Sequence, residues 1–242
     1  MPQKSTTCLL LLTCIIDNDM LYYLEMLKDS TQGIIDMYVI YDCAKGKPNA
    51  QCKNTPVYTF NSSLLPNFFH CDDLRLPNPL LALIDFSKSY RYDRYLLMEY
   101  DIAFSGDWRR FFQTIEKQHD ADYIHIDTDV LGGPQAHWPI KFIKDNPFKR
   151  LYFSWCQLFL VSHRYLTDLN EFICKNKSIY YEFLLPTMAY NGNYIVKQFE
   201  KFGYNFQVSW GPADFYEHKY VYEQKENTFY HPVKNLSLIS FH

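Results

Sequence analysis

Short apolar runs alternate along the chain with longer stretches in which apolar residues recur at helical spacing. Runs of this kind, without alternating polar residues, are typical of strands buried on both faces, and such strands alternate with helices in α/β proteins. The pattern predicts strands at residues 8–16, 34–41, 56–60, 94–99, 122–127, 157–161 and 205–209. It indicates a sheet with helices on both faces, in a single α/β domain over residues 1–242.

Helical spacing and capping residues predict helices between these strands. They are expected at residues 18–30, 79–90, 108–118, 164–175 and 180–200. Asn18 and Asp107 are good capping residues, and Pro79 suits a first helical position. Loop-like breaks fall at 44–55, 61–78 and 131–149, and none has the length or composition of a linker between independent domains.

Composition limits the classes of function. The chain has 242 residues, is 48% hydrophobic and carries a formal net charge of −3, which gives no general electrostatic reason to bind nucleic acid or an acidic membrane. Aromatic residues make up 18%, and most of these rings are expected in the core. Surplus rings can line a groove for a polyhydroxylated ligand such as a sugar. Trp138 and Trp155 are candidates to stack on an acceptor sugar, with ordinary core packing as the alternative.

The cysteines and the N-terminal segment indicate a cytoplasmic protein. Seven cysteines are scattered without any C-x-x-C pair, which suits a reducing compartment and argues against a disulfide framework or a zinc knuckle. The apolar run at residues 8–16 is too short to span a bilayer and lacks a small-residue cleavage pattern. We therefore interpret it as a buried strand and expect no transmembrane segment.

The run at residues 94–99 leads into Glu99-Tyr100-Asp101. In open α/β sheets, ligands bind beyond the carboxyl ends of strands. Side chains two residues apart on an extended segment point the same way, so Glu99 and Asp101 are expected to converge while Tyr100 faces the opposite side. Two carboxylates suit Mg²⁺ or Mn²⁺ carrying a nucleotide diphosphate. The alternative is that both acids only cap local backbone groups.

In its context, this E-Y-D segment resembles the D-x-D signature of the metal-dependent glycosyltransferases with the GT-A fold. The similar features are the strand–helix–strand unit at 8–41, the helix and strand that lead into E-Y-D, the G-D-W helix start after it, and F-Y-H-P-V-K at 229–234. The resemblance implies a GT-A-like, Rossmann-related mixed sheet flanked by helices, with Mn²⁺ or Mg²⁺ as cofactor. It also implies a nucleotide-diphosphate sugar as donor and a saccharide or glycoconjugate as acceptor.

The resemblance also assigns roles to residues. Asp101 becomes the principal metal ligand, and His231 completes the metal site. Glu99 stands where the family usually has Asp and is expected to contact the ribose or the water shell of the metal. Lys234 can neutralise a phosphate oxygen.

Two strand ends are expected to hold the nucleotide. Thr13 and Asp42 follow the first two predicted strands, where the resembled fold grips the base and ribose. No G-x-G-x-x-G and no Walker loop occurs, so the sequence supports neither a dinucleotide enzyme nor a P-loop kinase.

An inverting transfer needs a carboxylate that takes the proton of the acceptor hydroxyl. Glu182 lies in an aromatic and aliphatic stretch, where a raised pKa is expected, and its place in the chain resembles that of the base in inverting GT-A enzymes. An ordinary acid in the first turn of a helix is an equal alternative. Asp127 and Asp129 compete for the role of the base or for binding of acceptor hydroxyls, and retention of configuration also stays open.

Two other functions remain as alternatives. The first is a carbohydrate-binding or scaffold protein that has this fold without catalysis. The second is a metal-dependent nucleotidyltransferase or phosphohydrolase, although such enzymes usually have more acidic ligands or a basic phosphate loop.

Overall fold

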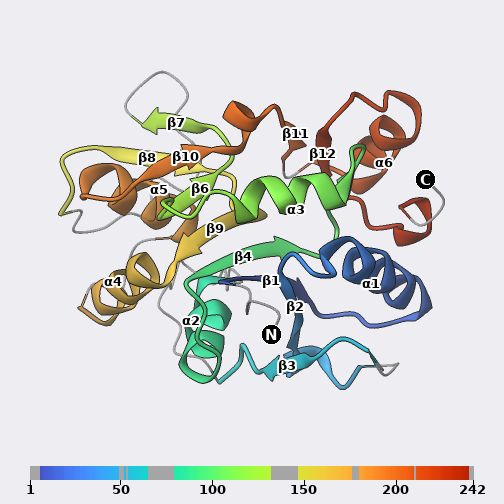
Figure 1. Ribbon diagram of the computed structural model, residues 1–242, viewed down its shortest axis with the longest axis horizontal. Coiled ribbons are helices and arrows are strands. Elements are labelled where there is room, and N and C mark those ends of the chain that lie inside the picture. The colour runs from blue at the N-terminus through green and yellow to red at the C-terminus, as the bar shows by residue number, and fades with distance from the viewer. Residues whose placement is uncertain are drawn as a thin grey trace.

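A seven-stranded mixed sheet forms the centre of the computed structural model, which describes residues 6–48, 52, 54–64, 79–131, 147–175, 180–209 and 211–239 (Figure 1). The strand order is β10-β6-β9-β4-β1-β2-β3. These strands are β1 (Thr7–Thr13), β2 (Asp36–Asp42), β3 (Val57–Phe60), β4 (Arg94–Glu99), β6 (Tyr123–His125), β9 (Leu158–Ser162) and β10 (Val196–Gln198). β9 runs antiparallel to both its neighbours, whereas the other pairings in this sheet are parallel.

Helices cover both faces of the sheet. α1 (Asn18–Thr31) and α3 (Trp108–Glu116) pack on one face, and α2 (Pro79–Ser89), α4 (His163–Lys175) and α5 (Tyr181–Asn191) pack on the other. Alternate residues of β1 and β4 enter the two cores: Leu11 and Leu96 face α1 and α3, while Leu10 and Leu97 face the opposite helices. This burial on both sides explains the continuous apolar runs in the sequence.

Two smaller sheets flank the central one. The first has the order β11-β12-β5, with β11 (Asn205–Val208), β12 (Thr228–His231) and β5 (Ala103–Phe104), and α6 (Ala213–Tyr222) packs beside it. The second pairs β7 (Thr128–Leu131) with β8 (Leu151–Ser154). Short 3₁₀ helices are η1 (Cys43–Lys45), η3 (Phe199–Phe202) and η4 (Leu236–Leu238). Because β12 pairs with β5, the end of the chain lies beside the segment that follows β4.

The prediction of a mixed α/β sheet flanked by helices is confirmed, with several local corrections. The helix expected at 180–200 is wrong beyond Asn191, because the chain leaves the helix at Gly192 and then forms β10. α1 is capped by Asp17 instead of Asn18, since the Asp17 carboxylate accepts the Met20 N–H. The strand expected at 205–209 exists as β11 but lies in the smaller sheet.

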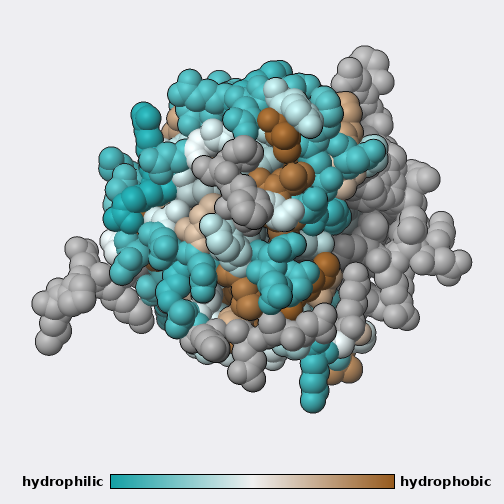
Figure 2. Space-filling view, turned by 90° about the vertical axis from the view of Figure 1, so that its right-hand side faces the viewer, coloured by the Kyte–Doolittle hydropathy of each residue, from teal (hydrophilic) through white to brown (hydrophobic). Residues whose placement is uncertain are grey.

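Most aromatic rings pack inside the molecule, as expected from the composition. Twelve of them belong to the largest fully buried side chains of the described residues. The surface in Figure 2 is mainly hydrophilic and is interrupted by separate hydrophobic groups. Among the described residues, no helix combines the length and apolar character that crossing a bilayer requires.

Candidate active site

Glu99 and Asp101 lie where β4 leaves the central sheet. The chain runs from β1 to β2 and β3 on one side and then returns to place β4 on the other side of β1, so the strand order reverses between β1 and β4. In α/β sheets such a reversal opens a crevice at the carboxyl ends of the strands. The Tyr100 N–H donates to the Leu12 carbonyl (3.1 Å), which fixes the first residue after β4 to the end of β1.

His231 joins the two acids from the other end of the chain. It is the last residue of β12, and its peptide bond to Pro232 is cis. Its Nε2 lies 3.2 Å from Glu99 Oε2 and 3.4 Å from Asp101 Oδ1. The Val233 N–H donates to the Asp101 carbonyl (2.8 Å), which holds the two segments together. The three residues predicted from E-Y-D and H-P-V-K therefore form one cluster.

Charge within the cluster is closely balanced. Burial disfavours protonation of His231, but the carboxylates of Asp101 and Glu99 outweigh burial and raise its pKa to about 9. Burial alone would raise the pKa of Asp101, which is 2% exposed, but interaction with His231 and Lys234 lowers it overall. Without a metal ion, a protonated His231 and Lys234 thus compensate the two acids.

Lys234 extends the cluster toward solvent. Its amino group bonds to Asp101 Oδ2 and lies 5.3 Å from the centroid of the Tyr100 ring. Tyr100, expected on the side opposite the acids, therefore also lies beside Lys234, because the chain turns after Glu99 instead of continuing as a strand. The Lys234 side chain is 55% exposed, so it can reach a ligand that approaches from solvent.

The cluster has the ligand set of a divalent-metal site. One ligand atom from each of Glu99, Asp101 and His231 lies within 4.8 Å of the others. The His231 atom that faces both carboxylates is Nε2, so the imidazole presents a ligating nitrogen to the same place as the acids. Two carboxylates and an imidazole suit Mn²⁺, and Mg²⁺ is compatible with the acids. An ion bound here replaces the proton that His231 otherwise holds.

Glu182 belongs to the same region. It lies in the first turn of α5 and is 1% exposed. Burial is the main cause of its raised pKa of about 8, and the negative charge of Glu99 is the second. The Cys156 amide, His231 and the Tyr180 hydroxyl lower the pKa only in part. Glu182 is thus electrostatically coupled to the cluster, as a base beside it would be.

Thr13 and Asp42 lie at neighbouring strand ends but are engaged in local hydrogen bonds. The Thr13 hydroxyl donates to the Ile15 carbonyl (2.8 Å) and accepts the Ile15 N–H (3.0 Å). Asp42 Oδ1 accepts the N–H groups of Ala44 (3.0 Å) and Ser62 (3.1 Å). Their contacts with a nucleotide stay predictions.

The competing acids belong to the region of β6 and β7. Asp127 follows β6, where its N–H donates to Glu200 (2.9 Å) and its carboxylate accepts from Gln198 (2.8 Å). Asp129 is in β7, and its side chain is outside the described part. Trp155 is partly buried and packs against both cores, which favours the core interpretation. Trp138 lies outside the described residues.

Gln157 is a polar residue of this region that the sequence pattern did not single out. It is 3% exposed, and its backbone carbonyl oxygen accepts a hydrogen bond from the Glu99 N–H (2.9 Å). The available signal was its position as the polar first residue of the apolar run at 157–161.

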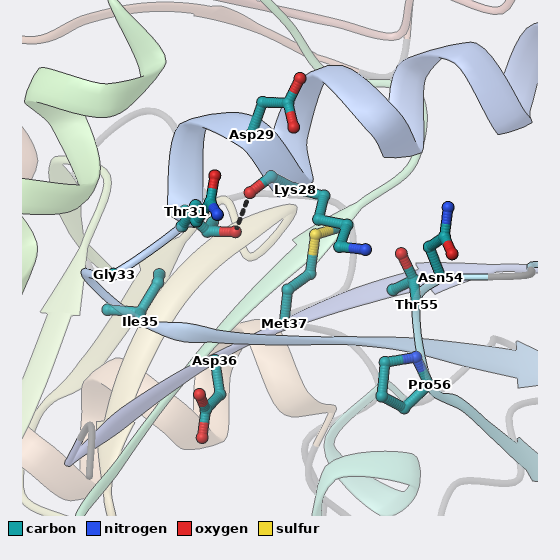
Figure 3. Close-up of a pocket in the computed structure, with 11 residues that line it drawn as sticks. Lys28, Asp29, Thr31, Gly33, Ile35, Asp36, Met37, Asn54, Thr55 and Pro56 are labelled. Carbon is teal, nitrogen blue, oxygen red and sulfur yellow. Dashed lines mark hydrogen bonds between the residues drawn. The ribbon is translucent and has the colours of Figure 1, made fainter. Parts of the chain in front are cut away.

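A separate pocket of about 350 Å³ lies at the opposite edge of the sheet (Figure 3). It is lined by the last turn of α1, the start of β2 and the segment before β3, including Lys28, Asp36 and Thr55. These are the amino ends of strands, whereas the acid and histidine cluster lies at the carboxyl ends. The pocket is therefore not part of the candidate site.

No protein-family model matches the chain, and no curated protein matches it in sequence. Among solved structures, it is similar to the galactosyltransferase LgtC in complex with donor and acceptor sugar analogs, with a TM-score of 0.47 and 10% identity over 90% of this chain and 79% of that chain. It is also similar to core-mannan synthase A from Aspergillus fumigatus in its Mn/GDP form, with a TM-score of 0.46 and 9% identity over 81% of this chain and 73% of that chain.

A third similar structure is 4-diphosphocytidyl-2C-methyl-D-erythritol synthase from Anaerococcus prevotii, with a TM-score of 0.44 and 8% identity over 79% of this chain and 86% of that chain. Similarity at this level concerns the general course of the backbone. The chemistry of this chain has to be inferred from its own residues.

Proposed function

We propose that the chain is a divalent-metal-dependent glycosyltransferase that moves a sugar from a nucleotide diphosphate to a hydroxyl of a saccharide or glycoconjugate. The supporting observation is the meeting of Glu99, Asp101 and His231 at the switch point of the sheet, with the coupled carboxyl group of Glu182 on the adjoining helix. A metal site and a candidate base near it are the two elements that such a transfer needs.

Each residue has a role in this proposal. Asp101, Glu99 and His231 hold Mn²⁺ or Mg²⁺, which when bound supplies positive charge for the leaving diphosphate. Lys234 adds a second positive charge from the solvent side. Thr13 and Asp42 are proposed to contact the nucleotide, since they end the strands β1 and β2 at the same edge of the sheet.

Glu182 is proposed as the base. The oxygen of the acceptor hydroxyl forms a bond to the anomeric carbon, the bond from that carbon to the diphosphate oxygen breaks with its electron pair, and Glu182 takes the hydroxyl proton. Because the charge of Glu99 helps to raise the pKa of Glu182, a cation that offsets this charge brings Glu182 toward its proton-accepting form. Asp129 is the alternative base.

A screen with nucleotide sugars tests the proposal. Purified protein is incubated with UDP- and GDP-sugars, with and without Mn²⁺ and without acceptor, and the products are separated. We expect slow, Mn²⁺-dependent release of nucleoside diphosphate. Release of sugar 1-phosphate would indicate attack on the diphosphate, and thermal stabilisation by saccharide alone, with no turnover, would indicate a carbohydrate-binding protein. Either result would overturn the proposal.

A further inference from the structure

Gln157 and Glu99 project from the same face of the central sheet. The Glu99 N–H donates to the Gln157 carbonyl (2.9 Å), which continues the antiparallel register in which Met98 lies opposite Leu158. Directly opposed residues of antiparallel strands have neighbouring side chains on one face. The side chain of Gln157 is therefore the immediate neighbour of the metal-ligating Glu99.

The shared face is the one that α5 covers. Side chains alternate along a strand, and Leu97 and Phe159, two residues from Glu99 and Gln157, belong to the core packed under α2, α4 and α5. Glu182 is in the first turn of α5, the helix that packs on this face. Gln157 and Glu99 therefore lie side by side on the face of the sheet that α5 covers.

Oε1 of Gln157 is buried and has no hydrogen-bond partner in the protein. Folded proteins pair nearly all buried polar groups, so such an atom indicates a polar ligand or bound water. A hydroxyl group suits this position, because it both donates and accepts and therefore satisfies either orientation of the amide.

We propose that Gln157 is a specificity-determining residue for the transferred sugar and hydrogen-bonds one of its ring hydroxyls. This inference rests on the proposed function. The sugar is bonded directly to the diphosphate that the metal cluster holds, so its ring lies next to Glu99, where the Gln157 amide is.

The variant Gln157→Met tests the assignment, because methionine has a similar length and no hydrogen-bonding amide. Calorimetry in Mn²⁺ would compare UDP and GDP with UDP-glucose, UDP-galactose, UDP-N-acetylglucosamine and GDP-mannose. We expect the affinity for the nucleoside diphosphates to change less than twofold. The affinity for the preferred nucleotide sugar should fall about 5- to 100-fold, and the preference among the sugars should narrow.

Thermal unfolding separates this role from a structural one. Replacing a buried, unpaired polar group by an apolar group of similar shape is neutral or stabilising, so the melting temperature of Gln157→Met should be unchanged or higher. Gln113→Met, on the exposed side of α3, is the control, and it should change neither the affinity for nucleotide sugars nor the melting temperature. If Gln157→Met does not fold, Gln157→Asn keeps the amide but shortens its reach and is measured in the same way.

The outcomes are distinct. If Gln157→Met binds nucleoside diphosphates normally and its preference among the sugars is unchanged, the Gln157 amide hydrogen-bonds to water or to other protein groups. This result would overturn the assignment of Gln157 to the sugar and would leave the proposed function standing. A parallel loss of nucleotide affinity and melting temperature would assign Gln157 a structural role. Failure of the wild-type protein to bind any nucleoside diphosphate in Mn²⁺ would overturn the proposed function, and the subsite with it.

Discussion

At the scale of single residues, the proposed binding of a metal ion depends most directly on the negative charge of Asp101. Its carboxylate is 2% exposed and faces His231 on one side and Lys234 on the other. Asp101→Asn keeps the shape but removes the negative charge that we propose holds a divalent ion. We expect Mn²⁺-dependent turnover to fall to near background, while circular dichroism stays that of the wild type.

The matched control is Asp120→Asn, which removes an exposed carboxylate paired with Lys197 at the other end of α3. It should retain activity. Near-normal turnover of Asp101→Asn in Mn²⁺ would contradict the assignment of Asp101 as a metal ligand.

Glu182 is the residue on which the type of transfer depends. Glu182→Gln keeps the size of the side chain and removes its capacity to accept a proton, so affinities for metal and nucleotide should be retained. Turnover should fall by a factor on the order of 10² to 10⁴, the usual range for a general base. The remaining rate should lose the decline at acidic pH that titration of Glu182 produces.

Two results would count against Glu182 as the base. One is normal turnover of Glu182→Gln, and the other is a product with retained configuration at the anomeric carbon. In the first case Asp129 is the next carboxylate to replace, followed by Asp127.

Residue chemistry was predictable only where the sequence carried a local signal. Glu99 and Asp101 end a visible apolar run, and His231 lies in a distinctive segment, so their meeting could be expected. Gln157 had only its position as the polar first residue of an apolar run. Its importance comes from its register with Glu99 and from a missing hydrogen-bond partner, and both are properties of the assembled sheet.

At the scale of elements, α3 provides a test of local capping. Asp107 Oδ1 accepts the Arg110 N–H (3.1 Å) at the start of this helix. Asp107→Ala should lower the free energy of unfolding by about 1 kcal/mol, and Asp107→Asn by much less, because asparagine caps almost as well. Urea unfolding measures both values. Equal stability of all three proteins would mean that the cap contributes nothing, and nucleotide affinity should not change in any of them.

Some element boundaries agreed with the sequence because a cap or a proline stood at the start of the helix. Pro79 and Asp107 marked the starts of α2 and α3 correctly. The helix expected at 180–200 ended early, although Gly192 between two asparagines was a visible turn signal. Residues 196–198 form β10 because their backbone pairs with β6, a long-range contact that no local pattern contains.

At the scale of the whole molecule, the raised pKa of Glu182 predicts how stability depends on pH. The folded metal-free protein keeps this proton up to a pKa of about 8, whereas the unfolded chain releases it near the usual pKa of about 4.3. Between these values the folded state binds more protons, so the free energy of unfolding falls as pH rises, by up to about 1.4 kcal/mol per pH unit.

Urea unfolding between pH 5 and pH 8, in the presence of a chelator, measures this effect. Glu182→Gln should show a flatter pH dependence than the wild type. The pH dependence of His231 has the same sign and remains in the variant, since its raised pKa gives stability that is lost toward pH 9. Identical slopes for the two proteins would contradict a buried, protonated Glu182.

The pairing of β12 with β5 also sets an order of events during synthesis. All seven strands of the central sheet are complete once residue 198 has been made, whereas His231 and Lys234 come more than thirty residues later. A nascent chain that has reached residue 198 therefore contains every strand of the central sheet, and Glu99 and Asp101 with them, but not yet His231. Under the proposed function, all three residues can hold a metal ion together only after β12 has been synthesised.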